Sequence, residues 1–134
     1  MYLNKLSIEQ KNLFLDLCIH GANANNEFAD DEKAIVNAYC EEMNIPVRYD
    51  EQTPFEECVD KLIKISSEKE LREILVELTA LILADNVCDE YEEKFMQEFI
   101  AKVGISDSDQ KKILDIIVKI SALYKELDSF VSQK

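Results

Sequence analysis

The sequence predicts an all-α fold: a single domain of six helices, built as two pseudo-repeats of a three-helix unit. Its 134 residues include only two glycines and two prolines, whereas Leu, Ile, Glu, Lys and Ala are abundant. Apolar residues recur at helical spacing, and no segment shows the strict alternation of a half-buried strand. The length fits one domain, which is long enough to bury a core without disulfides or metals.

Helix starts are marked by polar residues that can cap the backbone. Capping-box patterns begin at Ser7, Thr53 and Ser67, because each is followed three residues later by Gln or Glu. Pro54 suits the first position of a helix, where the missing N–H needs no partner. Asp or Ser precedes each of the other helices. The expected caps are Ser7, Asp30, Thr53, Ser67, Asp89 and Ser106.

Helix ends are marked by Gly21, Asn44 and Gly104. These residues tolerate the left-handed conformation that commonly terminates a helix. The starts and ends together predict six helices, at about residues 7–21, 30–44, 53–66, 67–84, 89–103 and 106–131.

The two pseudo-repeats follow from a shift of 60 residues, which needs no gap and relates residues 7–66 to residues 67–131. Only six residues are identical over positions 7–45, but caps, apolar stripes and helix ends align in register. Both copies keep the i, i+1, i+4, i+5, i+8 spacing of a core-facing helix, so they are expected to share one core. The alternative is a helical bundle whose periodicity imitates a repeat.

The charge of the chain restricts its partners. It carries 28 acidic and 15 basic residues, a net charge of −13 that is divided almost evenly between its two halves. Such a surface repels nucleic acid and anionic lipid, whereas cations and basic proteins are compatible ligands. We therefore expect a protein partner of unknown identity, no nucleic acid and no membrane insertion, with the oligomeric state left open.

The cysteines indicate a reducing compartment. Cys18, Cys40, Cys58 and Cys88 form no CxxC pair, and the first three lie among apolar residues at helical spacing. Buried, reduced thiols are expected in a cytoplasmic protein. The N-terminal segment lacks the hydrophobic core of a signal peptide, and the longest apolar run, 78–84, is too short to span a bilayer.

No catalytic motif is present, which favours a non-enzymatic role. The chain has no serine- or cysteine-based catalytic arrangement, no glycine-rich phosphate loop and no HExxH. His20, the single histidine, ends the first helix, where a cationic ring suits the helix dipole. An enzyme with carboxylates on metal ions ranks far lower, because such helical sites usually recruit Glu-x-x-His pairs.

Asp85, Asp89 and Glu92 are the candidate ligands of a divalent cation. Asp85 lies at a helix C-terminus, where unsatisfied carbonyls disfavour a carboxylate by roughly 0.3–1 kcal/mol. A bound cation reverses that sign, and three oxygen donors from two helix ends suit Ca²⁺ or Mg²⁺. The alternative is that these residues only form helix caps and an Asx turn.

The corresponding loop of the first repeat is the weaker candidate, because one of its positions is the neutral Asn25. No cofactor other than such a cation is expected. The candidate ligands of this loop are Asn25, Glu27, Asp30 and Glu32.

The segment Leu83-Ala84-Asp85-Asn86-Val87, followed by Asp89, Glu92 and a stripe ending at Gly104-Ile105, resembles the TerB-like domain of tellurite-resistance proteins. The resemblance covers the second repeat well and the first loosely. It implies an all-helical pseudo-repeat domain, acidic cation-binding residues and a role in a tellurite or stress response, sometimes beside DnaJ-type co-chaperone domains. The sequence departs from that pattern at Asn86, where the family prefers Gly, and at Asn25, where Asp is expected.

Two functions from different classes remain. The first is a non-enzymatic acidic helical module that serves as a protein-interaction scaffold in a stress or tellurite-type response. The second is a protein that binds a divalent cation or responds to a metalloid through its acidic interhelical loop. Thermal unfolding with added cation or chelator separates them, because a ligand that binds only the folded state raises its stability.

The cation hypothesis predicts that Asp85→Asn weakens binding of Ca²⁺ or Mg²⁺, because the change removes one of three carboxylates. The measurement is the shift of melting temperature with cation concentration for both proteins. A variant that is more stable at every cation concentration, with an unchanged cation-dependent shift, contradicts a metal site and leaves two ordinary helix ends.

Overall fold

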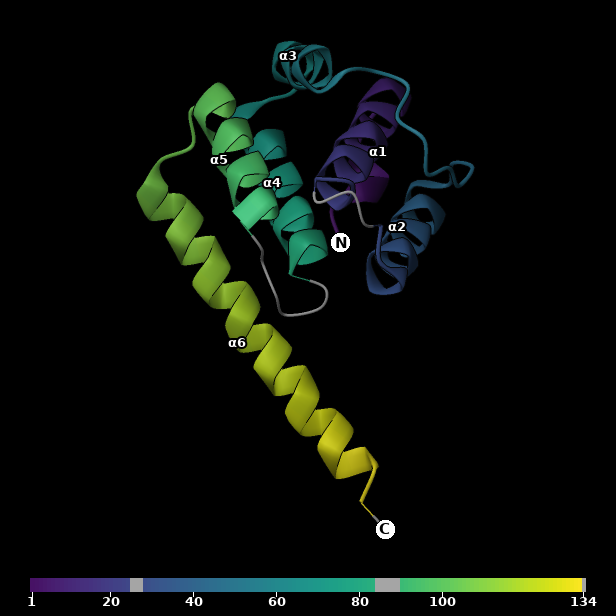
Figure 1. Cartoon of the computed structure of the whole chain (residues 1–134), viewed down its shortest axis with the longest axis vertical. Coiled ribbons are helices and arrows are strands. Elements are labelled where there is room, and N and C mark those ends of the chain that lie inside the picture. The colour runs from purple at the N-terminus through teal and green to yellow at the C-terminus, as the bar shows by residue number, and fades with distance from the viewer. Residues whose placement is uncertain (25–27, 84–89, 134) are drawn as a thin grey trace. The chain divides into compact units, whose positions relative to one another are not determined.

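A computed structural model describes residues 1–24, 28–83 and 90–133, and all of its regular structure is helical (Figure 1). Six α-helices and one short 3₁₀ helix occur in these residues, with no strand among them, which confirms the expected all-α class. The chain divides into two compact units, Met1–Gly104 and Ile105–Lys134. The expectation of a single domain stays a prediction.

The first unit contains five of the α-helices, and the second contains one. Every α-helix lies within two residues of its predicted bounds, whereas the 3₁₀ helix η1 was not predicted. The elements are η1 (Leu3–Lys5), α1 (Ile8–Ala22), α2 (Asp30–Met43), α3 (Phe55–Ile65), α4 (Glu68–Ile82), α5 (Glu90–Val103) and α6 (Asp107–Val131).

Three of the predicted caps are confirmed. Ser7 forms a reciprocal capping box with Gln10: the Ser7 Oγ accepts the Gln10 N–H at 3.1 Å, and the Gln10 side chain accepts the Ser7 N–H at 2.8 Å. Ser67 forms the same box at the start of α4, and the Ser106 Oγ caps α6. The sequence predicted the starts of α1 and α4 correctly because both partners of each reciprocal bond are present in the capping-box pattern.

Two predicted caps are wrong. Helix α3 begins at Phe55 after Pro54 with no side-chain cap, and the Thr53 carbonyl is instead bonded to a histidine of α1. Asp30 is the first residue of α2 and not its cap, because Ala29 holds the cap position. The predicted cap Asp89 lies outside the described residues.

Helix α1 forms the centre of the first unit. It contacts α2, α3, α4 and α5, and it is apolar on nearly all sides, as expected of a helix enclosed by others. Its side chains pack with stripes from the surrounding helices. The largest fully buried side chains are Leu3, Phe14, Leu15, Leu17, Ile19, Met43, Leu62, Ile74, Leu75, Leu78, Leu81 and Phe99.

Gly21 was predicted to end the first helix, and this is wrong. Helix α1 continues to Ala22, and Gly21 is buried. A Cβ at Gly21 would lie 2.9 Å from the Phe95 Cε1 and 3.2 Å from the Ile82 Cδ1. Gly21 therefore provides the close approach of α1 to α5 and does not serve as a helix stop.

The other two predicted helix ends are confirmed. Asn44 has a φ of 56° and Gly104 has a φ of 79°, so both occupy the left-handed region. Asn44 also donates its backbone N–H to the last turn of α2. This is the geometry that closes a helix C-terminus.

The packing of Gly21 predicts that Gly21→Ala destabilises the protein by about 1–3 kcal/mol, because the new methyl group overlaps the Phe95 ring. Chemical denaturation of both proteins measures the difference. At a helix position with free space, the same change would stabilise the protein by roughly 0.5–1 kcal/mol.

A Phe95→Leu background supplies the control for this prediction, since leucine has no Cε1 atom to overlap the methyl group. The cost of Gly21→Ala should be smaller there than in the wild-type background. Equal costs in both backgrounds contradict the proposed contact.

Candidate functional site

The residues predicted to bind a cation are only partly described. Asp85 and Asp89 lie outside the described residues, as do Asn25 and Glu27. Glu92 is 5% exposed in the first turn of α5. Of the three stronger candidates, the structure therefore describes only Glu92, and their convergence stays a prediction.

The described candidates of the first loop have a structural role at the start of α2. Asp30 is exposed, whereas Glu32 is only 5% exposed. The Glu32 Oε1 accepts the backbone N–H of Ala29 at 3.2 Å, which satisfies a donor at the helix start. This contact matches the alternative in which acidic residues serve as helix caps.

No group of three His, Cys, Asp or Glu side chains with metal-binding geometry occurs in residues 1–24, 28–83 and 90–133. The predicted cation site needs Asp85 and Asp89, which are outside these ranges. It therefore stays a prediction.

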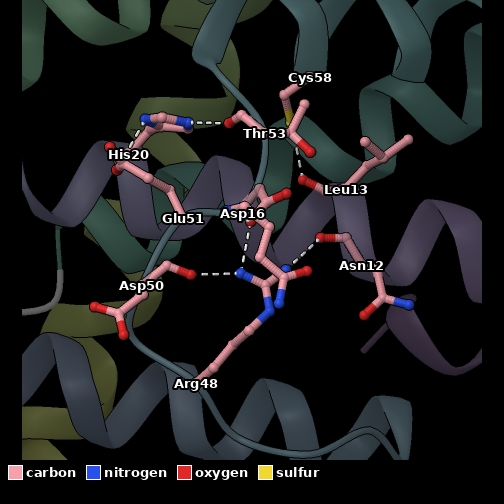
Figure 2. A network of polar contacts seen from close by, with 10 residues as sticks. Asn12, Leu13, Asp16, His20, Arg48, Asp50, Glu51, Thr53 and Cys58 are labelled. Carbon is pink, nitrogen blue, oxygen red and sulfur yellow. Dashed lines mark hydrogen bonds and ion pairs between the residues drawn. The ribbon is translucent and has the colours of Figure 1, made fainter.

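An ion pair joins the buried Asp16 to the partly exposed Arg48 in the first unit, and the sequence did not indicate it (Figure 2). Asp16 lies in the middle of α1 and is 2% exposed. The Arg48 Nη1 lies 2.6 Å from the Asp16 Oδ1, and the same oxygen accepts the Gln52 N–H at 2.9 Å. A charge-assisted bond and a backbone bond thus converge on one carboxylate.

The Arg48 guanidinium also binds main-chain oxygens on both sides of it. Its Nη1 donates to the Asp50 carbonyl at 2.7 Å, and its Nη2 donates to the Asn12 carbonyl at 3.2 Å. Asn12 belongs to α1, whereas Asp50 belongs to the segment between α2 and α3. Arg48 and Asp16 therefore hold the segment 44–54 against α1.

His20 contacts the C-terminal end of the segment 44–54 (Figure 2). Its Nε2 lies 2.7 Å from the Thr53 carbonyl, and its Nδ1 lies 3.2 Å from a Glu51 carboxylate oxygen. A carbonyl can only accept a hydrogen bond, so the Nε2 carries its hydrogen. The ring also stands edge-on to Phe55, with 6.1 Å between centroids. His20 thus connects α1 to this segment through contacts that the sequence did not predict.

A polar pocket of about 590 Å³ lies beside this network. Tyr49, one of its lining residues, donates its hydroxyl to the Asn37 side chain at 2.6 Å, and its ring stands edge-on to Phe28. Among the described lining residues, none is a cysteine, serine or threonine that could act as a nucleophile beside the histidine. The lining residues are His20, Asn23, Tyr49, Asp50 and Glu51.

The three described thiols are free and buried, as predicted for Cys18, Cys40 and Cys58. Burial raises the pKa of all three, and for Cys58 burial together with the nearby Asp16 charge raises the pKa to about 12. The Cys58 thiol donates to the Leu13 carbonyl at 3.1 Å. Thiols held in the protonated form are poor nucleophiles and poor metal ligands. Cys88 lies outside the described residues.

The second unit presents an apolar surface along α6. None of the 25 residues of this helix is buried. Nine of the fifteen large apolar side chains that are exposed in the described part of the chain belong to it. They are Leu114, Ile116, Val118, Ile120, Leu123, Tyr124, Leu127, Phe130 and Val131.

The sequence predicted this helix at 106–131 but not its exposed face. The spacing of its apolar residues does indicate such a face, because they recur at alternating intervals of three and four residues over almost three heptads. The positions with this spacing are Ile113, Ile116, Ile120, Leu123, Leu127 and Phe130.

No family model, no curated protein and no solved structure matches this chain. Among the described helices, none is both long enough and apolar enough to cross a membrane.

The ion pair predicts that Arg48→Met destabilises the protein by about 3–5 kcal/mol, because it leaves the Asp16 carboxylate buried without its cation. Methionine keeps much of the aliphatic volume of the side chain, so the lost charge is the main change. Urea denaturation followed by circular dichroism measures the loss.

Lys61→Met is the matched control, because Lys61 pairs with Glu57 on the surface at 3.6 Å and is half exposed. This change should alter stability by no more than about 1 kcal/mol. Equal effects of the two substitutions contradict a special role for the Asp16–Arg48 pair.

Proposed function

We propose that this chain is a non-enzymatic acidic helical module that binds proteins, and that the apolar face of α6 is its binding surface. The observation that carries the proposal is that α6 buries none of its residues and exposes nine large apolar side chains, seven of which share one broad face. The other two, Leu114 and Val118, lie outside this face. An exposed apolar surface of this kind marks an interaction site in a soluble protein.

The position of the charge supports a docking role for α6. Residues 105–134 contain five acidic and five basic side chains, so their net charge is zero. The first unit, with 23 acidic and 10 basic residues, therefore carries the whole net charge of −13. When the net charge is counted for each structural unit, the first unit is acidic and the unit that contains α6 is neutral. Counting the charge over two equal halves of the sequence does not show this difference.

The energy available from the face is sufficient for specific binding. Burying one large apolar side chain contributes roughly 1.5–3 kcal/mol, so a partner that covers several of them offsets the cost of association. An amphipathic helix of this kind binds either in the groove of another protein or along another helix.

The pseudo-repeat belongs to the same proposal, and the helix bounds support it. The TerB-like assignment is kept as part of the proposal on the resemblance of the sequence alone. Helix α1 spans Ile8–Ala22 and α4 spans Glu68–Ile82, an offset of 60 residues at both ends. Helices α2 (Asp30–Met43) and α5 (Glu90–Val103) have the same offset. Corresponding buried positions and left-handed ends at Asn44 and Gly104 add to this agreement.

The biological setting that we propose, a stress or tellurite-type response, rests on the TerB-like resemblance of the segment around Asp85. In that setting the protein acts as a scaffold that recruits a partner. A divalent cation at Asp85, Asp89 and Glu92 would add regulation to such a scaffold without being required for docking.

The proposal predicts that Ile120→Lys abolishes partner binding, because it places a charge in the middle of the apolar face. The tagged full chain is cross-linked in extracts of its native host, and the retained proteins are identified and quantified. Wild type should retain a stoichiometric partner, either a second copy or another protein, and Ile120→Lys should lose it.

Val118→Lys is the matched control. Val118 is also exposed, at 54%, but at 100° per residue it lies 160° around the helix from Ile120. The Val118→Lys protein should retain the same partner as wild type. Identical sets of captured proteins for all three chains, or none for wild type, contradict α6 as the binding surface.

A further inference from the structure

Seven of the exposed apolar side chains of α6 belong to a heptad pattern that suits pairing with another helix, and the half-buried Ile113 and Ile117 complete it. Residues at heptad positions a and d are all apolar from 113 to 130, and positions e, at 117, 124 and 131, are apolar as well. Such a face is wider than the seam of a simple two-stranded coiled coil. The g positions, in contrast, carry the charged residues Lys112, Lys119 and Glu126.

We infer that α6 pairs in antiparallel orientation with α6 of a second copy of this chain. The inference rests on the proposed function, since it names the occupant of the same apolar face. Three independent features of the helix favour a second copy in this orientation: the order of its core residues, its flanking charges and the position of the acidic unit.

The order of the core residues suits antiparallel pairing. The a and d positions are isoleucines in the first half of the helix and Leu or Phe in the second half. An antiparallel pair places an a residue opposite a d residue, so every layer combines one isoleucine with one longer side chain. A parallel pair would instead place Phe130 against Phe130. The antiparallel layers are Ile113 with Phe130, Ile116 with Leu127 and Ile120 with Leu123, each occurring twice by symmetry.

The flanking charges are complementary only in the antiparallel pair. In this register the g position of Lys119 lies beside the g position of Glu126 of the second copy, and the symmetry repeats the contact. Two Lys–Glu pairs therefore flank the central layers. In a parallel pair, g positions face e positions, and Lys119 would lie beside Tyr124 of the second copy. Charge complementarity of this kind sets partner choice and orientation.

The position of the acidic unit also favours the antiparallel orientation. Each copy carries its charge of −13 in residues 1–104, which join α6 at its N-terminal end. A helix of 25 residues is roughly 37 Å long. Antiparallel pairing attaches the two acidic units at opposite ends of the pair, so their points of attachment are several Debye lengths apart at physiological salt. Parallel pairing attaches both units at the same end.

The test is the mass of the full chain in solution, measured by sedimentation equilibrium over a range of micromolar concentrations. Wild type and Val118→Lys should form dimers, and Ile120→Lys should be monomeric. Circular dichroism of each protein checks that the first unit remains folded.

Charge reversal tests the orientation. Glu126→Lys replaces both Lys–Glu pairs by Lys–Lys contacts, and Lys119→Glu replaces them by Glu–Glu contacts. Each single change should weaken dimerisation roughly tenfold or more. The double variant Lys119→Glu/Glu126→Lys restores the pairs in reversed order and should dimerise within about threefold of wild type.

Other outcomes overturn the inference. Dimers that are insensitive to both single reversals contradict the antiparallel register. A wild-type monomer that still captures another protein through Ile120 contradicts a second copy as the occupant but leaves the proposed function intact. A wild-type monomer with no Ile120-dependent partner contradicts both.

Discussion

The attachment of the segment between α2 and α3 to α1 depends on one ion pair, between the buried Asp16 and Arg48. Asp16 places a carboxylate in the middle of the most enclosed helix of the structure, where an unpaired charge would be very unfavourable. Arg48 compensates for it from a segment that has no regular secondary structure. The same guanidinium binds main-chain carbonyls of both parts, so the segment between α2 and α3 has a defined path. That path brings Thr53 to His20 and places α3 against α1.

This interaction also explains why the pocket beside it is polar. The segment that Arg48 holds contributes Tyr49, Asp50 and Glu51 to the lining, and α1 contributes His20. The hydrogen-bonding groups of His20 and Tyr49 are directed to neighbouring residues of the chain. The pocket therefore results from the way in which the segment between α2 and α3 is attached to α1. The side chains of His20 and Tyr49 in its lining have structural roles.

Local signals made the helices predictable. Ser7 and Ser67 form caps with residues only three positions away, and Asn44 and Gly104 end helices through their own backbone conformation. The information needed for these features is contained in a few adjacent residues. The same applies to the helical class of the fold, because apolar spacing and the scarcity of glycine and proline are properties of the local sequence.

Features that depend on distant contacts were not predictable in this way. Asp16 and Arg48 are 32 residues apart, and nothing in the pattern of either neighbourhood indicates that they meet. Gly21 was predicted to end a helix because glycine is common at helix ends. Its actual role, packing against Phe95 of α5, depends on a contact between residues far apart in the sequence. Of the candidate cation site, Glu92 is buried at the start of α5, and the positions of Asp85 and Asp89 lie outside the described residues.

The lack of burial along α6 links its folding to its occupancy. A helix that buries no residue gains no stability from a core, so its helicity depends on its length and on local interactions. The helix–coil equilibrium of α6 is then shifted by whatever covers its apolar face. Association lowers the free energy of the helical form, and dissociation returns the segment toward coil. The free energy needed to order the segment as a helix reduces the affinity of binding at α6. Binding is therefore readily reversible, and its affinity changes with any substitution that stabilises or destabilises the helix.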